Sequence, residues 1–389
     1  MSQSSLGFHT LTMSTRLADI YEDQLIKHLE LYSQKTGGIQ MFTNDYGNLV
    51  IKFHKEDKGI KWLIRYGVWF EDIKMRSDVI EVTINPKILS GIRDYITAAD
   101  IYDMNIAIIN FNRISKEISP YLFTFNQYTF RRVDYCLNFS LNELVPGCSH
   151  ELIMKLFRRG DIPPHYVEWM EYDEKAHRMK SRPSSFYLKC DSANINCYSK
   201  YMKFVEQSEE NIKHGYLPVP QQTMEASRDI IRFEVQCKSP KIYNESRKIN
   251  ENRLAINTYR DLLGAQSCLA QIIHYYKVTI GEGDWYSLSE AQRIVEKHGF
   301  YKQKKERLLN VLREVSQCRS LADAKAKHQG TDLGDFKRTV NELARIGINP
   351  VTIPREWGVD RIPNLLSTYL GKHPEVYPNT LNTVSPILE

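Results

Sequence analysis

Four segments that alternate between apolar and polar residues carry acids and a tyrosine at their polar positions. Successive side chains of a β-strand point to opposite faces of a sheet. If these segments are strands of one sheet, their apolar residues pack on a core and their polar residues project from the open face. The residues that this places on the open face are Glu81, Asp134, Tyr198, Lys200 and Glu234.

Carboxylates that converge on one face repel each other unless a cation joins them. We therefore expect Asp134, Glu234 and Glu81 to bind a divalent metal ion, with Mg²⁺ or Mn²⁺ as the hard cation that oxygen ligands select. A phenol beside that ion could attack a phosphodiester if its proton is accepted in the transition state. Tyr198 is the predicted nucleophile, Lys200 would stabilise negative charge, and the metal would polarise the phosphate.

Simpler roles compete with this interpretation. An Arg-x-Asp or Arg-x-Glu pattern on a strand is commonly a surface ion pair, and Tyr-x-Lys on an outward face is commonly a solvated edge. Tyr201 is a second phenol close by, and it is the alternative nucleophile. If the strand continues to residue 201, however, alternation turns its side chain toward the core, which favours a packing role. The eleven histidines include no His-x-His pair, which disfavours a metal site built on paired histidines.

The elements that position these residues change in character near residue 245. Before it, alternating segments predict strands at 7–14, 48–54, 61–70, 78–85, 131–141, 184–190, 194–204 and 229–238, with helices at 17–32, 98–112 and 150–159. After about residue 250, the helical period predicts helices at 253–263, 268–277, 287–298, 302–315, 321–328 and 334–346. We expect an α+β fold: an antiparallel-sheet catalytic domain with flanking helices over 1–245, and a helical domain over 246–389 with a DNA-binding or accessory role.

Composition sets the remaining bounds. The chain has 389 residues, 42% of them hydrophobic, which suffices for two domains with large cores, and a net charge of +5 permits a polyanionic partner without requiring one. Seven scattered cysteines without a Cys-x-x-Cys pair favour reduced thiols in a cytoplasm. The first residues lack the apolar run of a signal peptide, and no segment has the apolar length of a membrane helix, so we expect no membrane partner.

Six segments together carry a resemblance to a known family: VIEVTINPKILSG (79–91), RRVDYCLNFS (131–140), NINCYSKYMKFVE (194–206), IIRFEVQCK (230–238), HGFYKQKKERL (298–308) and DFKRTVNELARIGI (335–348). In order and separation they resemble the gene II/X replication-initiation proteins of filamentous phages and related plasmids. A more distant resemblance extends to plasmid rolling-circle initiators and relaxases with RxD, YxK and RFE segments. The resemblance implies an endonuclease that nicks one strand at a replication origin, joins a tyrosine to the 5′ phosphate and later rejoins the strand.

The resemblance also implies roles for single residues. Tyr198 and Lys200 fall on the tyrosine and lysine of the YxK segment. Asp134 falls on the RxD acid, Glu234 on the RFE acid, and Glu81 on the acid before a proline-containing turn. This sequence departs from the phage members at Tyr201, where they have no tyrosine. A mechanism that uses two catalytic tyrosines therefore stays open.

The implied partner is origin DNA, single-stranded or melted, with most affinity from phosphate contacts. The predicted DNA-binding residues are Arg132, Lys203, Arg232 and Lys238. No GxxxxGK[ST] loop occurs, so a host helicase and a polymerase are expected as further partners. Two alternatives remain: a non-catalytic DNA-binding regulator that uses the helices near 334–347, and a metal phosphodiesterase in which water attacks. The oligomeric state does not follow from the sequence.

Overall fold

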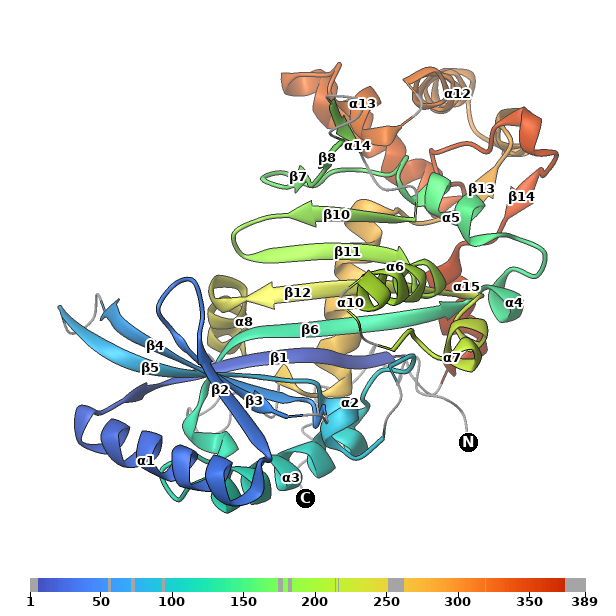
Figure 1. The fold of residues 1–389 in the computed structure, drawn as a ribbon. Coiled ribbons are helices and arrows are strands. Elements are labelled where there is room, and N and C mark those ends of the chain that lie inside the picture. Colours follow the sequence, from blue (N-terminus) through green and yellow to red (C-terminus); the bar gives the residue numbers. More distant parts are fainter. Residues whose placement is uncertain are drawn as a thin grey trace. The chain divides into compact units, whose positions relative to one another are not determined.

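The computed structural model describes residues 6–54, 57–70, 74–92, 95–173, 178–180, 184–213, 215, 217–250, 262–318 and 320–374. Its largest sheet has ten strands in the hydrogen-bonded order β2-β3-β4-β5-β1-β6-β12-β11-β10-β7 (Figure 1). The pairings from β2 to β6, and that of β10 with β7, are antiparallel. The strands are β1 (Leu6–Leu17), β2 (Ile39–Thr43), β3 (Leu49–Phe53), β4 (Ile60–Phe70), β5 (Met75–Ile84), β6 (Thr129–Ser140), β7 (Val167–Glu168), β10 (Ser185–Lys189), β11 (Ala193–Ser199) and β12 (Ile230–Lys238). Together with many helices, this sheet confirms the expected α+β class.

The chain divides into two compact units that interleave along the sequence. The first unit comprises Met1–Leu137, Asp191–Asn194 and Glu234–Cys268, and the second comprises Asn138–Cys190, Ile195–Phe233 and Leu269–Glu389. Strands β6, β11 and β12 each contribute residues to both units. Compactness therefore does not divide the chain at residue 245, and a separate role for 246–389 stays a prediction.

An aromatic cluster forms much of the core of the first unit. The Phe111 ring lies 6.5 Å from that of Trp62 and 5.8 Å from that of Phe125, and all three side chains are buried. Phe111 belongs to α3, which starts at a capping box made by Asp100 and Asp103. Helices α1 and α3 lie side by side, as Figure 1 shows. The described helices that lie entirely in this unit are α1 (Asp19–Thr36), α2 (Pro86–Leu89), α3 (Ile101–Ile118) and α8 (Ser239–Asn250), with a 3-10 turn η1 (Phe125–Gln127).

The second unit has its own core around Tyr276. The Tyr276 ring meets those of Phe139, Phe157 and Phe233 at centroid distances of 5.8, 5.7 and 5.5 Å. Helices α12, α13 and α14 pack on one another (Figure 1). The helices are α4 (Leu141–Leu144), α5 (His150–Phe157), α6 (Lys200–Lys213), α7 (Gln221–Ala226), α10 (Ala265–Thr279), α11 (Leu288–Lys297), α12 (Lys302–Cys318), α13 (Leu321–Lys325), α14 (Gly330–Arg345) and α15 (Leu365–Lys372), with a 3-10 turn η2 (Arg355–Trp357).

Helices α2, α4, α7 and α8 were not predicted from the sequence, and neither were several short strands. These strands are β2 and β7, the pair β8 (Glu171–Asp173) and β9 (Arg178–Lys180), and the pair β13 (Trp285–Tyr286) and β14 (Arg361–Ile362). The predicted helix at 253–263 falls largely on residues outside those described. Within the described part of the chain, no helix combines the length and the apolar character that a membrane span requires.

The predicted strand at 194–204 is wrong beyond Ser199. β11 ends there and α6 begins at Lys200. The buried side chains of α6 are Lys200, Phe204 and Ser208, which recur every four residues, and this spacing follows a helix rather than a strand. Lys200 and Lys203 therefore lie on a helix, not on the open face of a strand.

We expect Phe111→Ala to lower the free energy of unfolding by about 3–5 kcal/mol, because a buried aromatic side chain leaves a cavity that the core fills only in part. Ile109→Ala is the matched control on the same helix, since Ile109 is 66% exposed, and it should change stability by less than about 0.5 kcal/mol. Urea unfolding followed by circular dichroism measures both. Equal effects of the two substitutions would show that Phe111 does not anchor the core.

Candidate metal centre

A bulge in β1 sets the position of the first candidate ligand, His9. Between two regular pairs with β6, two residues of β1, His9 and Thr10, stand opposite the single residue Asp134. The flanking pairs are Phe8 with Tyr135 and Leu11 with Val133. A two-against-one bulge bends the strand and re-aims a side chain, and such bulges are enriched beside functional sites.

The bulge is held in place on the other edge of β1. Phe8 exchanges two backbone hydrogen bonds with Ala99, of 2.8 and 3.0 Å. A Cβ atom on Gly7 would lie 2.1 Å from the Ala99 carbonyl oxygen, so this close approach requires glycine. The segment before α3 thus fixes β1 directly ahead of His9.

Three side chains from three strands of the first unit converge at this point. One possible ligand atom each from His9 (β1), Asp134 (β6) and Glu234 (β12) lies within 4.8 Å of the others. His9 Nδ1 is 3.4 Å from Glu234 Oε2. Both carboxylates are buried, whereas the His9 side chain is 32% exposed. The group therefore has a buried acidic floor and an imidazole that reaches solvent.

Asp134 is held by the guanidinium of Arg132 through two hydrogen bonds. Arg132 Nε donates to Asp134 Oδ1 at 2.6 Å, and Nη2 donates to Oδ2 at 2.5 Å. The pKa of Asp134 is raised to about 7, because burial and, to a smaller extent, the charge of Glu234 raise it while Arg132 counteracts both in part. A second cation near this pair would relieve the repulsion that Arg132 leaves.

Glu234 is oriented by two buried amides. Gln236 Nε2 donates to Glu234 Oε1 at 2.8 Å, and Asn194 Nδ2 donates to Gln236 Oε1 at 3.2 Å. The other carboxylate oxygen of Glu234 faces His9. This is the pattern of a ligand whose orientation is set by partners that do not themselves touch the metal.

The donor set suits a divalent transition ion. Two carboxylates and one imidazole offer oxygen and nitrogen ligands, and an octahedral ion would keep positions for water or phosphate oxygens. Because imidazole prefers transition metals to Mg²⁺, the set favours Mn²⁺ within the predicted pair of ions.

The structure does not bring Glu81 into this group. Glu81 lies on β5 opposite Ser14 of β1, five residues along that strand from His9, or roughly 15 Å at the usual rise per residue. Its carboxylate lies 3.6 Å from Arg65 Nη1. A ligand role for Glu81 therefore finds no geometric support here.

The two predicted catalytic residues lie at the junction of β11 and α6. Tyr198 is half-buried near the end of the strand, and Lys200 is buried as the first residue of the helix. Lys200 Nζ lies 5.9 Å from the centre of the Tyr198 ring and 5.2 Å from that of Phe204. The alternative nucleophile, Tyr201, lies on α6 with the Arg228 guanidinium 5.2 Å from its ring centre. The lysine thus lies near the Tyr198 ring from the first turn of a helix, not from the strand face on which it was predicted.

The predicted DNA-binding residues have different environments. Arg232 is fully buried and donates to Asn138 Oδ1 at 2.8 Å, so it does not line a surface path as predicted. The polar face of β12 is covered here, which strand alternation alone does not reveal. Arg132 is 39% exposed beside the metal centre, Lys203 is exposed on α6 with Glu206 at 3.8 Å, and Lys238 is half-buried at the end of β12.

His9 is the candidate ligand that the sequence interpretation missed. The sequence signal is a break in the alternation of β1. The apolar residues Leu6 and Phe8 occupy even positions, whereas Leu11 and Met13 occupy odd positions. Phe8, Leu11 and Met13 are nevertheless all buried. A change of phase within one strand marks a bulge. The sequence interpretation considered only paired histidines as metal ligands, so it did not include the single histidine at that bulge.

No protein-family model matches the sequence, and no curated protein matches it either. Among solved structures, the chain is similar to the rolling circle replication initiator protein from Geobacillus stearothermophilus, with a TM-score of 0.28 and 11% sequence identity. The match covers 71% of this chain and 98% of that one. A likeness at this TM-score assigns no role to any residue of this chain.

The pKa of Asp134 predicts a pH dependence of metal binding. Its folded pKa lies near 7, above the ordinary value of 3.8, so the folded protein keeps a proton that the unfolded chain releases. The contribution of Asp134 to the free energy of unfolding is therefore greatest below pH 3.8 and declines as the pH rises to about 7. Mn²⁺ must displace this proton, so its affinity should rise about tenfold per pH unit up to pH 7 and then level off.

Calorimetric titration with Mn²⁺ in two buffers of different ionisation enthalpy checks this expectation, since about one proton should be released near pH 6. Asp134→Asn is the control, because it should weaken binding and remove the proton release. An Mn²⁺ affinity that does not change between about pH 5.5 and 7 would contradict the assignment of Asp134 as a ligand.

Gln236→Ala should weaken Mn²⁺ binding by about 10- to 100-fold, because the carboxylate of Glu234 loses the donor that orients it. Gln221→Ala is the matched control: it removes the same side chain at an exposed position of α7 and should leave the affinity unchanged. Electron paramagnetic resonance of free Mn²⁺ measures both. Unchanged affinity in Gln236→Ala would remove the amides from any positioning role.

Proposed function

We propose that this protein is a metal-dependent DNA nicking and joining endonuclease that initiates rolling-circle replication through a 5′-phosphotyrosine intermediate. The observation that carries the proposal is the convergence of His9, Asp134 and Glu234 from three different strands. Two of the three are the acids that the RxD and RFE segments single out. The sequence resemblance to replication-initiation proteins adds the substrate, a replication origin.

A divalent ion at this centre would polarise the scissile phosphate and offset the charge that develops on its oxygens. His9, Asp134 and Glu234 would hold it, and Arg132, partly exposed beside Asp134, would add a cationic group for a phosphate. Gln236 keeps the Glu234 carboxylate in one orientation while the ion is bound. These residues supply binding and electrostatics, and a separate side chain must supply the nucleophile.

Tyr198 is the proposed nucleophile. It is half-buried near the end of β11, and the sequence resemblance places it on the tyrosine of the YxK segment. In the proposed step the phenol oxygen bonds to phosphorus, the bond from phosphorus to the 3′ oxygen breaks, and the phenol proton passes to a base. The Lys200 ammonium close to the ring supports the phenolate form.

The phosphotyrosine bond retains the energy of the phosphodiester, so rejoining needs no nucleotide. Because the sequence has no phosphate-binding loop of the motor type, we further propose that strand separation and synthesis come from a host helicase and polymerase. Origin DNA with an accessible single strand is the proposed substrate.

A regulator without catalytic activity draws less support. It would use the helices near 334–347, where Glu342 pairs with Lys304 and Arg307 of the basic start of α12. Lys305 of the same start lies 3.9 Å from Glu296. Most of the positive charge of that segment is thus offset within the unit. Lys302, which is 90% exposed, extends furthest into solvent.

Tyr198→Phe should abolish the covalent protein–DNA adduct and lower nicking by roughly 10³-fold or more, as expected when a nucleophile is removed. The assay uses the full-length protein, Mn²⁺ and a supercoiled plasmid that carries the DNA flanking its gene. Mass spectrometry of the peptide attached to the nicked strand identifies the residue.

Tyr201→Phe is the matched control and should retain both activities. An adduct on Tyr201 would transfer the role of nucleophile to that residue. Nicking without any adduct, and with equal rates in the wild type and Tyr198→Phe, would indicate attack by water and would refute the tyrosine mechanism.

A further inference from the structure

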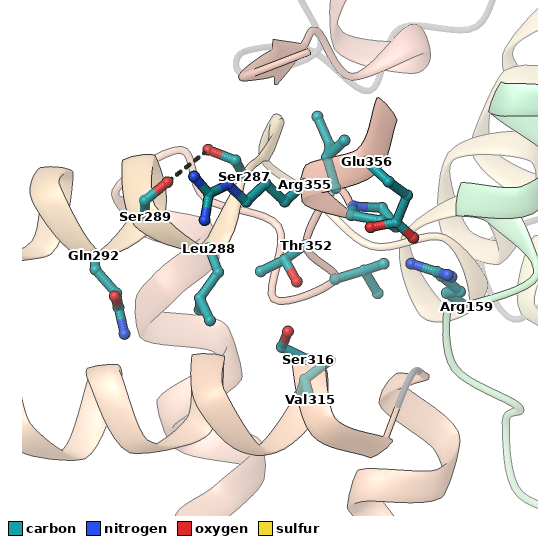
Figure 2. A pocket seen from close by; sticks show the side chains of 13 residues that line it. Arg159, Ser287, Leu288, Ser289, Gln292, Val315, Ser316, Thr352, Arg355 and Glu356 are labelled. Atoms are coloured by element: carbon teal, nitrogen blue, oxygen red, sulfur yellow. Dashed lines mark hydrogen bonds between the residues drawn. The ribbon is translucent and has the colours of Figure 1, made fainter. Parts of the chain in front are cut away.

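The second unit contains a cavity of about 840 Å³ (Figure 2). Its walls come from the start of α11, the C-terminal half of α12 and the segment 351–356, with Arg159 at one side. None of the lining residues belongs to the metal centre. A concave site of this size matches the range of small-molecule pockets in proteins.

The walls of this cavity combine polar groups with apolar residues, and they carry a net positive charge. The apolar lining residues are Leu288, Val315, Val351, Ile353 and Pro354. Hydroxyl and amide groups come from Ser287, Ser289, Gln292, Ser316 and Thr352. The charged lining residues are Arg159, Arg355 and Glu356, which leaves one positive charge in excess. Figure 2 shows the Arg355 side chain extending toward Ser287 and Ser289, with Arg159 and Glu356 on another side of the cavity.

Two cationic side chains lie over the indole of Trp357 beside this cavity. The Arg159 guanidinium carbon lies 5.3 Å from the Trp357 ring centre, and Lys155 Nζ of α5 lies 5.9 Å from it. An aromatic face attracts a cation and restricts the orientation of a guanidinium. Arg159 is therefore positioned, and Lys155 adds an exposed charge next to it.

The structure assigns this cavity as a binding site for a nucleotide unit. A guanidinium recognises a phosphate through paired hydrogen bonds, and Arg355, which extends toward Ser287 and Ser289, is the group that would do so. The hydroxyl and amide groups match sugar hydroxyls and base edges, which both donate and accept hydrogen bonds. The volume far exceeds the need of a bare phosphate ion, and the charged and polar groups of the wall disfavour a wholly apolar ligand.

This inference rests on the proposed function in one respect, namely that nucleic acid is the substrate. The same phosphate, sugar and base chemistry is offered by a DNA strand and by a free nucleotide. The two sources are separated by experiment, as follows.

Binding of a fluorescein-labelled 12-nucleotide oligothymidine to the full-length protein is measured by anisotropy without divalent metal. The protein carries Asp134→Asn, so a failure of the metal centre cannot change the result. Adding Arg355→Ala should weaken binding by about tenfold, the scale of one charge-assisted hydrogen bond, and lower the salt dependence by about one counterion. Arg293→Ala is the charge-matched control: Arg293 lies on α11, is 53% exposed and does not line the cavity.

Gln292→Trp, which fills the cavity without changing its charge, should also weaken binding, and circular dichroism melting confirms that each variant is folded. Competition by a mixture of the four deoxynucleoside monophosphates would identify a free nucleotide as ligand, and its absence would identify a strand. Equal weakening by Arg355→Ala and Arg293→Ala, or no weakening by Arg355→Ala and Gln292→Trp, would overturn the assignment. Absence of nicking by the wild-type protein in the Tyr198 experiment would refute the proposed function and would leave this binding result unaffected.

Discussion

The first unit depends on how it accommodates two carboxylates, Asp134 and Glu234, that lie close together out of contact with water. Repulsion between like charges strengthens as the dielectric constant falls, so this pair must be compensated where it stands. The guanidinium of Arg132 and the amide of Gln236 each satisfy one carboxylate, and His9 approaches from a third strand. A proton on Asp134 and a divalent cation are two ways of completing the compensation, which makes them competitors for one place.

Two of the three candidate ligands could be predicted from the sequence. Asp134 and Glu234 sit in strands whose alternation is unbroken, and alternation alone assigns each to the polar face. The third could not be chosen this way, because register decides it. β5 pairs with β1 so that Glu81 faces Ser14, whereas the bulge brings His9 opposite Asp134. Alternation fixes the face of a side chain and leaves its position along the sheet undetermined.

Two further differences have physical reasons of the same kind. The mixture of polar and apolar residues after Ser199 predicts that β11 continues. The four-residue spacing of Lys200 and Phe204 also fits a helix, and packing of these side chains selects the helix. Arg232 alternates with apolar residues as expected, but other parts of the chain cover it. The α+β class and most long elements were predictable because they depend on local periodicity, while coverage depends on tertiary packing.

The interleaved construction of the units has a consequence for synthesis on the ribosome. Strand β1 and most of β6 lie within the first 137 residues of the chain, but the first unit also needs the second half of β12, from Glu234 to Lys238. The acidic pair is therefore assembled only after the second half of β12 has emerged. Until then, the edge of β6 that later pairs with β12 is unpaired in the nascent chain. Its backbone N–H and C=O groups are therefore exposed to other chains.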